Sequence, residues 1–551
     1  MTTEGWRFEE ASRGSLFRGA ATVTSLSENS RRRWLAVFGL ALLGLMLRLT
    51  ALSESLWIDE LHTAWVAGGP WDELPQRAAL GNQTPWFFAI EWLLVQLFGP
   101  HDWLLRCPSV AFSLAAAVSV FCLVEKRVGS SRWALLVTGI SVADSHMIFF
   151  GTEARPYAAV LLMAVWHAGA LVGWWSKSGS WKAGLAWIVT GVAMLQLHWS
   201  AAWYLVWEAA CLLAVSLGKP EFPQRSRWIV LEIVAITATS FVSFDSLAWI
   251  ARRWDQWAVL ERPSSIWQLV DALHLGWYLG AVAVAWAAAL AARFRALDTR
   301  AAPSPNFLCL WLVPVVAAWA LAQLHVIPVF LPRYFIAVVP AAWLALAQLG
   351  LQVDRLDVRW PARLSAAGLL GVLVFLNLPL WVHLARQGVW RNEGWREALA
   401  FLEKQYRPDE PLLLRSGLLE AEQLPDVPSS NPGLWPYWSY PLRTFYSSRL
   451  SSAQIFLLDN SPQPKLDRAV RERLQRADRL WLLARSEPEF LERLTAWLTA
   501  ELDGQSWSVT AFHFGRVHVV RIQKPVEAVT LRGREPLPSS GGNVPTEQPG
   551  F

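Results

Sequence analysis

Charged residues are scarce in this chain. Asp, Glu, Lys and Arg make up 17% of its 551 residues, whereas about a quarter of the residues in a typical soluble domain are charged. Hydrophobic residues make up 54%, and the net charge is only +5. The basic residues lie in short clusters between apolar runs, which does not favour a nucleic-acid partner. The composition therefore argues against a soluble globular protein and favours one that lies in lipid.

Cysteine is scarce as well. The four cysteines are Cys107, Cys122, Cys211 and Cys309, and they have neither paired nor metal-ligand spacing. We interpret them as packing residues and assign no metal ligand. A cleavable signal is not expected, because polar and basic residues occupy roughly the first thirty positions. The first apolar run is instead expected to insert the chain into the membrane.

What the chain does contain is long apolar runs and 36 Trp residues. Trp favours the interface between membrane and water, and a membrane-spanning helix needs about 20 apolar residues. Such runs begin near Trp34, Trp103, Trp133, Tyr157, Trp181, Ala201, Trp228, Leu273, Phe307, Tyr334 and Arg363. The pattern predicts an α-helical polytopic membrane protein with about eleven spans in residues 34–384.

The distribution of Lys and Arg predicts the orientation of these spans. Residues 31–33 are all Arg and precede the first span, which places the segment 1–33 in the cytoplasm. Basic clusters recur in every second loop, and the loops between them are rich in Asp and Glu. Arg252, Arg253 and Arg262 are exceptions in one outer loop. An odd number of spans then places the chain after the last span outside.

The chain changes character after that last span. Its apolar pattern predicts a helix at 395–405, strands at 411–415, 455–458 and 480–483, helices at 465–476 and 487–502, and a hairpin at 507–522 turning at Gly515. Strands that alternate with helices predict a small extracytoplasmic α/β domain over residues 385–530. Residues 531–551 are rich in Pro, Gly and Ser, so we expect a disordered tail.

The loop between the first two predicted spans, residues 53–102, carries a pair of carboxylates. Asp59 and Glu60 follow Trp57 and Ile58 where the first span emerges. Taken alone, the pair would more often be a solvated helix end. However, apolar neighbours desolvate a carboxylate and raise its pKa, and acids at such depth usually have a partner or a function. A carboxylate there could act as general base on a hydroxyl group.

Two arginine motifs lie on the same predicted side. In Glu153-Ala-Arg155-Pro-Tyr157, Arg155 either binds a phosphate or pairs with Glu153, and the residues alone leave both alternatives open. In Arg333-Tyr334, the alternative to phosphate binding is anchoring at the membrane interface. Both motifs are therefore candidates for an anion site at the outer ends of spans.

Taken in order, these motifs resemble the GT-C superfamily of integral membrane glycosyltransferases. The resemblance is to bacterial family 39 proteins, which are related to protein O-mannosyltransferases and to the lipid A aminoarabinose transferase. The matching segments are Trp57-Ile58-Asp59-Glu60, Asn82-Gln83-Thr84-Pro85-Trp86-Phe87, Leu105-Arg106-Cys107-Pro108-Ser109, Glu153-Ala154-Arg155-Pro156-Tyr157 and Arg333-Tyr334. The ordered set is more specific than any one motif. Many relatives have His-Pro or Asn-Pro where this chain has Gln83-Thr84-Pro85.

The resemblance implies an inverting glycosyltransferase in the inner (plasma) membrane. Such an enzyme moves a hexosyl or pentosyl group from a polyprenyl-phosphate carrier to a protein, lipid or glycan acceptor on the outer face. Asp59 would be the catalytic base, and Glu60 would support it or help to position the acceptor or a divalent metal. The carrier phosphate would be held by Arg155, Arg333, Tyr157 and Tyr334, with Glu153 ordering Arg155. The residues expected to position the acceptor or the loop are His62, Asn82, Gln83, Pro85 and Arg106.

Two other classes of function remain as alternatives at this point. One is a membrane transporter or flippase, although such proteins tend to contain internal repeats and broken spans near the membrane midplane, and no such repeat stands out in this sequence. The other is a non-catalytic protein that binds lipid-linked glycans during envelope assembly. A divalent metal is compatible with sugar transfer, but fixed Arg side chains can neutralise a monophosphate leaving group without one.

Overall fold

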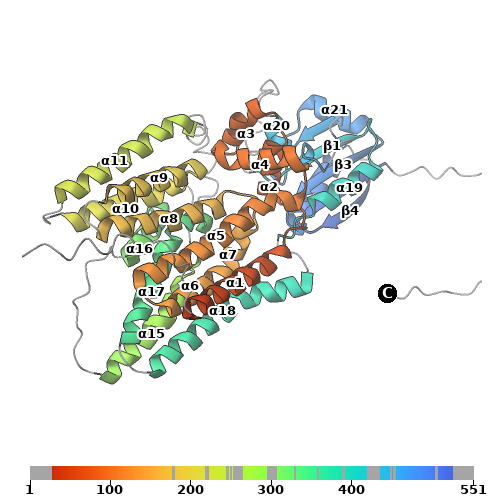
Figure 1. The fold of residues 1–551 in the computed structure, drawn as a ribbon. Helices are drawn as coiled ribbons and strands as arrows, with labels where there is room; N and C mark the ends of the chain where they lie inside the picture. Colours follow the sequence, from red (N-terminus) through yellow and green to blue (C-terminus); the bar gives the residue numbers. More distant parts are fainter. Residues whose placement is uncertain are drawn as a thin grey trace, which may run out of the picture.

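In the computed structural model, a long helical part is joined to a small α/β part at one end (Figure 1). The structure describes residues 28–176, 180–217, 222–243, 247–248, 251, 265–293, 307–327, 330–355, 359–387, 391–418, 435–446, 450, 454–502 and 507–524. The predicted disordered tail at 531–551 and the exceptions Arg252, Arg253 and Arg262 lie outside the described residues.

The helical part contains a helix at each of the eleven predicted apolar runs. Its helices are α1 (Glu28–Leu49), α5 (Asp102–Val128), α6 (Ser131–Ala143), α7 (Ser145–Gly151), α8 (Tyr157–Ser176), α9 (Trp181–Leu197), α10 (Ala201–Ser216), α11 (Phe222–Ser240), α14 (Ile266–Ala272), α15 (Gly276–Arg293), α16 (Phe307–Gln323), α17 (Val339–Arg355) and α18 (Arg359–Gln387). The described residues of this part also form two short 3-10 helices, η2 (Phe241–Ser243) and η4 (Pro332–Val338).

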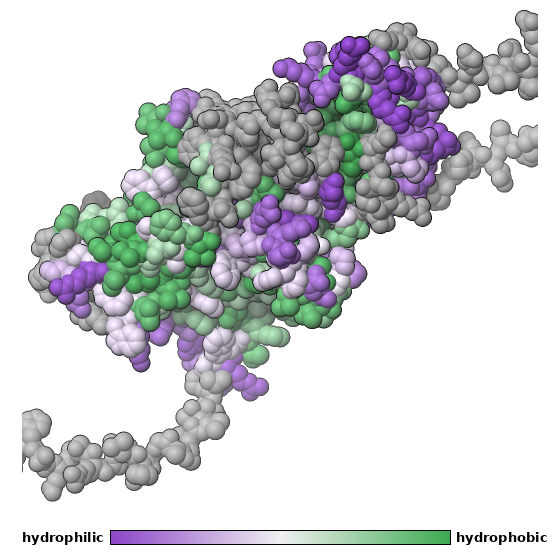
Figure 2. Space-filling model, turned by 90° about the horizontal axis from the view of Figure 1, so that it is seen from above, coloured by the Kyte–Doolittle hydropathy of each residue, from purple (hydrophilic) through white to green (hydrophobic). Residues whose placement is uncertain are grey.

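Within the described residues, four helices are long and apolar enough to cross a membrane, or six if each of two bent pairs counts as one span. The bends are 61° between α6 and α7 and 77° between α14 and α15. Large apolar side chains such as Phe38, Met46 and Phe375 are exposed on the helical part, as expected for a surface that faces lipid. Figure 2 shows apolar residues over this part and hydrophilic residues on the end formed by the α/β part.

The loop between α1 and α5 folds into short helices at the end where the α/β part sits. They are α2 (Ile58–Ala67), η1 (Trp71–Glu73), α3 (Leu74–Leu80) and α4 (Pro85–Phe98). Gly81 permits a close approach here, since a Cβ atom at this position would lie 2.2 Å from the ring of His62. The following residue, Asn82, has φ of 58°, a left-handed conformation that Asn tolerates better than most residues. The chain therefore turns sharply between α3 and α4.

The α/β part contains a five-stranded sheet in the order β2-β1-β3-β5-β4. Its strands are β1 (Pro411–Arg415), β2 (Gln454–Leu457), β3 (Arg479–Arg485), β4 (Ser508–Phe514) and β5 (Val517–Gln523), and its helices are α19 (Trp395–Gln405), α20 (Trp435–Trp438), α21 (Arg468–Arg476) and α22 (Pro488–Glu501), with η6 (Tyr440–Leu442). The first three strands pair in parallel, whereas β5 pairs antiparallel with β3 and β4. Each predicted strand and helix of this part is present.

The two faces of the sheet are covered differently. One face packs against α21 and α22 through Leu474, Leu494 and Leu498. The other shares a core with α19 and with the loop that carries α2, where Leu61 packs in the same cluster as Trp395. The α/β part is therefore joined to the predicted catalytic loop by apolar packing.

Candidate functional site

Asp59 lies in the first turn of α2, beside the end of the helical part. Its side chain is 24% exposed, and Arg333 Nη1 donates to Asp59 Oδ2 at 2.9 Å. Arg333, 31% exposed, comes from η4, far along the chain. A carboxylate in the first turn also faces the positive end of the helix dipole. The structure thus brings together two residues that the sequence assigned to one site.

The electrostatic surroundings of Asp59 favour its ionised form. Burial alone would raise the pKa of Asp59, but the positive charges of Arg333 and Arg155 outweigh this effect and hold its pKa below the ordinary value. Arg155 Nη1 also lies 3.4 Å from the backbone oxygen of Asp59. Asp59 is therefore a carboxylate at neutral pH, with two guanidinium groups close to it.

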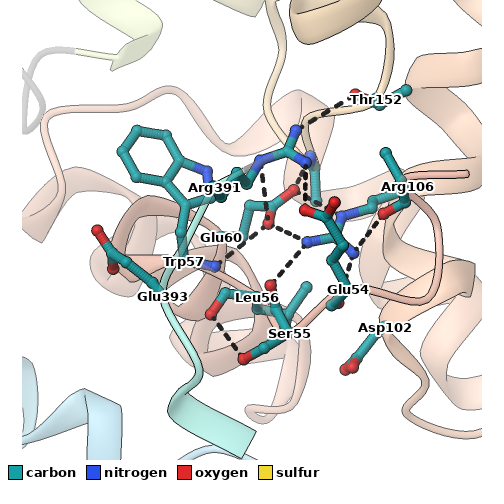
Figure 3. A network of polar contacts seen from close by, with 12 residues as sticks. Glu54, Ser55, Leu56, Trp57, Glu60, Asp102, Arg106, Thr152, Arg391 and Glu393 are labelled. Carbon is teal, nitrogen blue, oxygen red and sulfur yellow. Dashed lines mark hydrogen bonds and ion pairs between the residues drawn. The ribbon is translucent and has the colours of Figure 1, made fainter. Parts of the chain in front are cut away.

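Glu60, the next residue, lies in a closed network (Figure 3). The Arg106 guanidinium donates to both Glu60 oxygens, and neither side chain is exposed. The backbone N–H groups of Ala154 and Trp57 also donate to Glu60, at 2.9 and 3.3 Å. Although burial alone would raise the pKa of Glu60, Arg106 and Arg391 hold it below the ordinary value. These contacts fit a residue that supports the loop, and they leave Glu60 no exposed oxygen for an acceptor.

Arg106 ties several chain segments to the Glu60 carboxylate. Its Nη1 donates to the backbone oxygens of Ala51, Leu52 and Glu54 at 2.6 to 3.1 Å, and its Nη2 donates to that of Ser55. A single buried arginine thereby connects α5 to the chain that leaves α1. These hydrogen bonds hold the backbone that precedes α2 against α5.

Glu153 is fully buried, and neither of its carboxyl oxygens has a hydrogen-bond partner in the part of the chain that the structure describes. It therefore makes no direct pair with Arg155, in contrast to the role that the resemblance implied. Burial, reinforced by the negative charge of Asp59, raises the pKa of Glu153 to about 8 despite nearby arginines. At neutral pH Glu153 is mostly a neutral carboxylic acid next to Asp59.

Arg155 is held from both sides of its backbone. Thr63 of α2 donates to the oxygen of Ala154 at 2.7 Å, and Ser109 of α5 donates to the oxygen of Arg155 at 3.2 Å. The Arg155 side chain lies with Nη1 3.4 Å from His62 Nδ1. The turn between α7 and α8 is thus fastened to α2, which keeps the Arg155 guanidinium beside Asp59.

Tyr157 and Tyr334 meet around His198, which lies between α9 and α10. The ring of His198 is 5.1 Å from that of Tyr157 and 5.8 Å from that of Tyr334. Burial, together with the charges of Arg155 and Arg333, lowers the pKa of His198 to about 3. His198 is therefore neutral and adds aromatic surface without charge, a part in the site that the sequence did not indicate.

The remaining predicted residues lie in the surrounding shell. His62 Nε2 is 3.2 Å from the oxygen of Arg77. Gln83 Nε2 lies 3.5 Å from His198 Nε2. Asn82 is buried in the turn before α4, and Pro85 starts that helix. We refer to Asp59, Arg155, Arg333, Tyr157, Tyr334 and His198 as the Asp59 site. Gln83 contacts this site at His198, while Asn82 and Pro85 lie at the turn into α4.

The α/β part supplies contacts that the sequence did not indicate. Glu393 accepts from the backbone N–H of Ile58 at 3.1 Å, and Tyr440 donates to the Ile58 oxygen at 2.9 Å. Arg485 also pairs with Glu393 at 2.7 Å. Ile58 immediately precedes Asp59, so the α/β part fixes the start of the helix that carries it. These partners are hundreds of positions apart in the chain, and only tertiary packing brings them together.

Arg391 is a further buried cation near Glu60, and the sequence analysis did not identify it. Its side chain is 2% exposed, lies 3.8 Å from Glu54 and from Glu60, and donates to Thr152 at 3.3 Å (Figure 3). In the described part of the chain, no three His, Cys, Asp or Glu side chains gather in a metal-binding arrangement. The carboxylates here face arginines instead.

The fold is similar to that of solved structures. No protein-family model matches the sequence, and no curated protein matches it either. The structure of ArnT from Cupriavidus metallidurans in the apo state matches with a TM-score of 0.52 and 12% identity, over 90% of this chain and 98% of that one. ArnT from Cupriavidus metallidurans bound to undecaprenyl phosphate matches with a TM-score of 0.50 and 14% identity, over 91% and 99%. The chain thus has a GT-C-type fold like that of these structures, with apolar helices long enough to cross a membrane and a C-terminal α/β part.

Proposed function

We propose that this chain is an inverting glycosyltransferase that moves a sugar from a polyprenyl-phosphate carrier to an acceptor at the outer face of the membrane. The observation that carries the proposal is the ionised, partly exposed Asp59 beside the two arginines Arg333 and Arg155. A base and a pair of cations are what displacement of a phosphate by a hydroxyl group requires. The similar fold of ArnT, solved with undecaprenyl phosphate bound, supports a carrier of this class.

The proposed reaction is a single displacement. The acceptor oxygen forms a bond to the anomeric carbon of the sugar while the bond from that carbon to the phosphate oxygen breaks. Asp59 takes the hydroxyl proton, and the polyprenyl phosphate leaves with the bonding electrons against the guanidinium groups of Arg333 and Arg155. One base without a carboxylate nucleophile inverts the anomeric carbon, by analogy with glycosidases. Glu60 is bound to Arg106 and Glu153 is buried, so neither is placed as that nucleophile.

The contact between Arg333 and Asp59 suggests an order of events. Without donor, the guanidinium of Arg333 pairs with Asp59 at 2.9 Å and keeps it a weak base. A carrier phosphate would compete for the same guanidinium group, because phosphate is a strong acceptor for Arg. Its arrival would weaken the pair and make Asp59 more basic at the moment when the sugar is present.

Glu153 sets the charge of the site. With Glu153 neutral, the charges of Arg155, Arg333 and Asp59 sum to +1, which favours an anion. If Glu153 ionised, this sum would fall to zero. Its pKa of about 8 therefore keeps the site suitable for phosphate at neutral pH.

The contacts between the two parts of the chain suggest a role for each. Residues 34–384 would form the transferase domain, and residues 385–530 an α/β domain that fixes the first turn of α2 through Glu393 and Tyr440. The arginines before α1 favour a cytoplasmic N-terminus and an extracytoplasmic α/β domain in an inner (plasma) membrane.

The proposal is tested in cells, because this does not require the sugar to be known. Mass spectrometry would compare envelope lipids and glycoproteins of cells with the protein, cells without it, and cells carrying Asp59→Asn. We expect one sugar modification to be present only with the unaltered protein. If a well-expressed Asp59→Asn variant supports full modification, Asp59 is not the base and the proposed mechanism is wrong.

A further inference from the structure

Three ionisable side chains meet inside the helical part, and none of them takes part in the proposed reaction. They are His167 near the middle of α8, Glu208 near the middle of α10 and Glu232 near the middle of α11. His167 and Glu208 are fully buried, and Glu232 is 1% exposed. Ionisable groups at such positions are costly in a membrane protein and commonly have a function. We refer to these three residues as the His167 cluster.

One proton must lie between His167 and Glu208. His167 Nδ1 is 3.0 Å from the backbone oxygen of Trp187, which can only accept, so Nδ1 carries a hydrogen. The other nitrogen, Nε2, lies 2.8 Å from Glu208 Oε2. A nitrogen and an oxygen this close form a hydrogen bond only if one of them holds a proton. The pair is therefore either imidazolium with carboxylate or imidazole with carboxylic acid.

Glu232 is the unusual member of the cluster. Both of its carboxyl oxygens are buried, and neither has a hydrogen-bond partner in the described part of the chain. Glu232 Oε1 is 3.9 Å from His167 Nε2, too far for a hydrogen bond. It also lies 3.0 Å from where a Cβ atom of Gly191 would be, so α9 closes the cluster from that side. An ionised carboxylate here would be desolvated and would have no donor, which is very unfavourable.

Among the residues that the structure describes, no Lys or Arg forms an ion pair with Glu232. From α8 it faces His167, and from α10 it faces Glu208 and Tyr204, whose ring is 6.2 Å from that of His167. From α9, Gly191 lies beside Glu232, and Trp187 and Thr190 contact His167; none of the three ionises near neutral pH. The described residues form no arrangement that could hold a metal ion. The charge of a second carboxylate in this cluster is therefore best removed by a proton.

We propose that His167, Glu208 and Glu232 form a proton-binding site in the membrane part of the protein, which holds one proton between His167 and Glu208 and a second proton on Glu232. With both protons bound, the cluster is neutral overall and can remain buried between α8, α9, α10 and α11. The three residues do not belong to the Asp59 site, although α8 also carries Tyr157 at its first position. This inference therefore does not depend on the proposed sugar transfer.

Infrared difference spectroscopy on the full chain in lipid nanodiscs tests the second proton directly. The spectrum of Glu232→Gln is subtracted from that of the unaltered protein at neutral pH, in H2O and in D2O. We expect the difference to contain the C=O band of a protonated carboxylic acid, which shifts in D2O. Loss of an ionised carboxylate band instead would overturn the proposal. Glu73→Gln is the matched control, because Glu73 is 47% exposed in an ion pair with Arg77 and should lose a carboxylate band.

Thermal unfolding supplies a second readout. Gln has the shape of a neutral glutamic acid, so Glu232→Gln should fold with nearly unchanged Tm, whereas Glu208→Gln should lower Tm because it weakens the bond to His167. A large loss of stability in Glu232→Gln would contradict a neutral Glu232. The unaltered protein is also compared in sodium, potassium and choline buffers. A Tm that rises specifically with a metal cation, and that loses this rise in Glu232→Gln, would show that a metal ion and not a proton fills the cluster.

Discussion

The Asp59 site and the His167 cluster both gather ionisable side chains in a largely apolar protein, yet they differ in charge and in access. Around Asp59, cations outnumber ionised carboxylates at neutral pH, and Asp59 and Arg333 are 24% and 31% exposed. In the His167 cluster, two carboxyl groups lie beside one imidazole, and all three side chains are buried. An open, cation-rich site suits an anion such as a phosphate, whereas a closed, acid-rich one suits a proton.

The pair of Glu60 and Arg106 shows that burial and unbalanced charge are separate properties. It is as closed as the His167 cluster, but its carboxylate is fully matched by a guanidinium and two backbone N–H groups. Such a pair needs no ligand. Adjacent residues of one helix, Asp59 and Glu60, thus have different surroundings, because successive side chains point about 100° apart around a helix.

The largest expected effect is that of Asp59→Asn on sugar transfer. Asn keeps the size of the side chain but cannot accept the acceptor proton, so the transfer rate should fall by about 10²- to 10⁴-fold, as for other general bases. The rate is measured in membranes, using the modification identified by mass spectrometry. The control is Asp72→Asn, since Asp72 is an exposed acid in the same loop. An equal loss of transfer rate in Asp72→Asn and Asp59→Asn would contradict a specific role of Asp59 as the base.

Breaking the closed pair should affect stability and not the chemistry itself. Glu60→Gln leaves the Arg106 charge buried without its counter-charge, which typically costs about 3–5 kcal/mol. We expect a large fall in Tm of the purified protein. Glu73→Gln disrupts a more exposed pair with Arg77 and should cost about 1 kcal/mol or less. A Tm of Glu60→Gln equal to that of the control would show that Glu60 does not hold the loop.

Removing a cation from the open site should weaken binding of the carrier. In Arg333→Gln the phosphate loses a charge-assisted hydrogen bond worth about 1.5–3 kcal/mol, so the affinity for undecaprenyl phosphate should fall at least about tenfold. Binding is measured with the purified protein in detergent. Arg132→Gln, which removes a cation paired with Asp354, should bind normally. Unchanged binding by Arg333→Gln would exclude this residue from the phosphate site.

Raising the pH should have a smaller effect on the affinity for undecaprenyl phosphate. As pH rises through about 8, Glu153 loses its proton and the charge of the site falls from +1 to zero. The affinity for undecaprenyl phosphate should then decrease about fivefold, equivalent to about 1 kcal/mol of charge interaction. Asp59, whose pKa is lowered, stays ionised throughout this range. Glu153→Gln should abolish the decrease, and a decrease that persists in this variant would assign it to another group.

Much of the architecture follows from local patterns in the sequence. Apolar run length indicated a helix at each of eleven runs between α1 and α18, but not the short helices α3, α7 and α14. Periodicity indicated the strands and helices from α19 to β5 except α20. The motifs containing Asp59, Arg155 and Arg333 were expected on the same side of the membrane, and in the structure they lie close together. These features depend on spacing within short segments, or on the side of the membrane at which a span ends.

The partners of these residues could not be read from the sequence. Glu153 and Arg155 are two positions apart in the chain, yet the carboxyl oxygens of Glu153 form no hydrogen bond with Arg155. Glu393 accepts a hydrogen bond from the backbone of Ile58, although 335 positions separate them in the sequence. The His167 cluster was missed because its members are far apart in sequence and each looks like an isolated polar residue in an apolar run. Such contacts depend on how helices pack, which no local pattern encodes.

The most direct test of the Asp59 site is a structure of this protein with undecaprenyl phosphate bound in nanodiscs. We expect the phosphate to lie within hydrogen-bond distance of Arg333 and Arg155. The contact of 2.9 Å between Arg333 and Asp59 should lengthen as the phosphate binds the guanidinium group. A phosphate bound elsewhere, with Arg333 still paired to Asp59, would contradict this expectation.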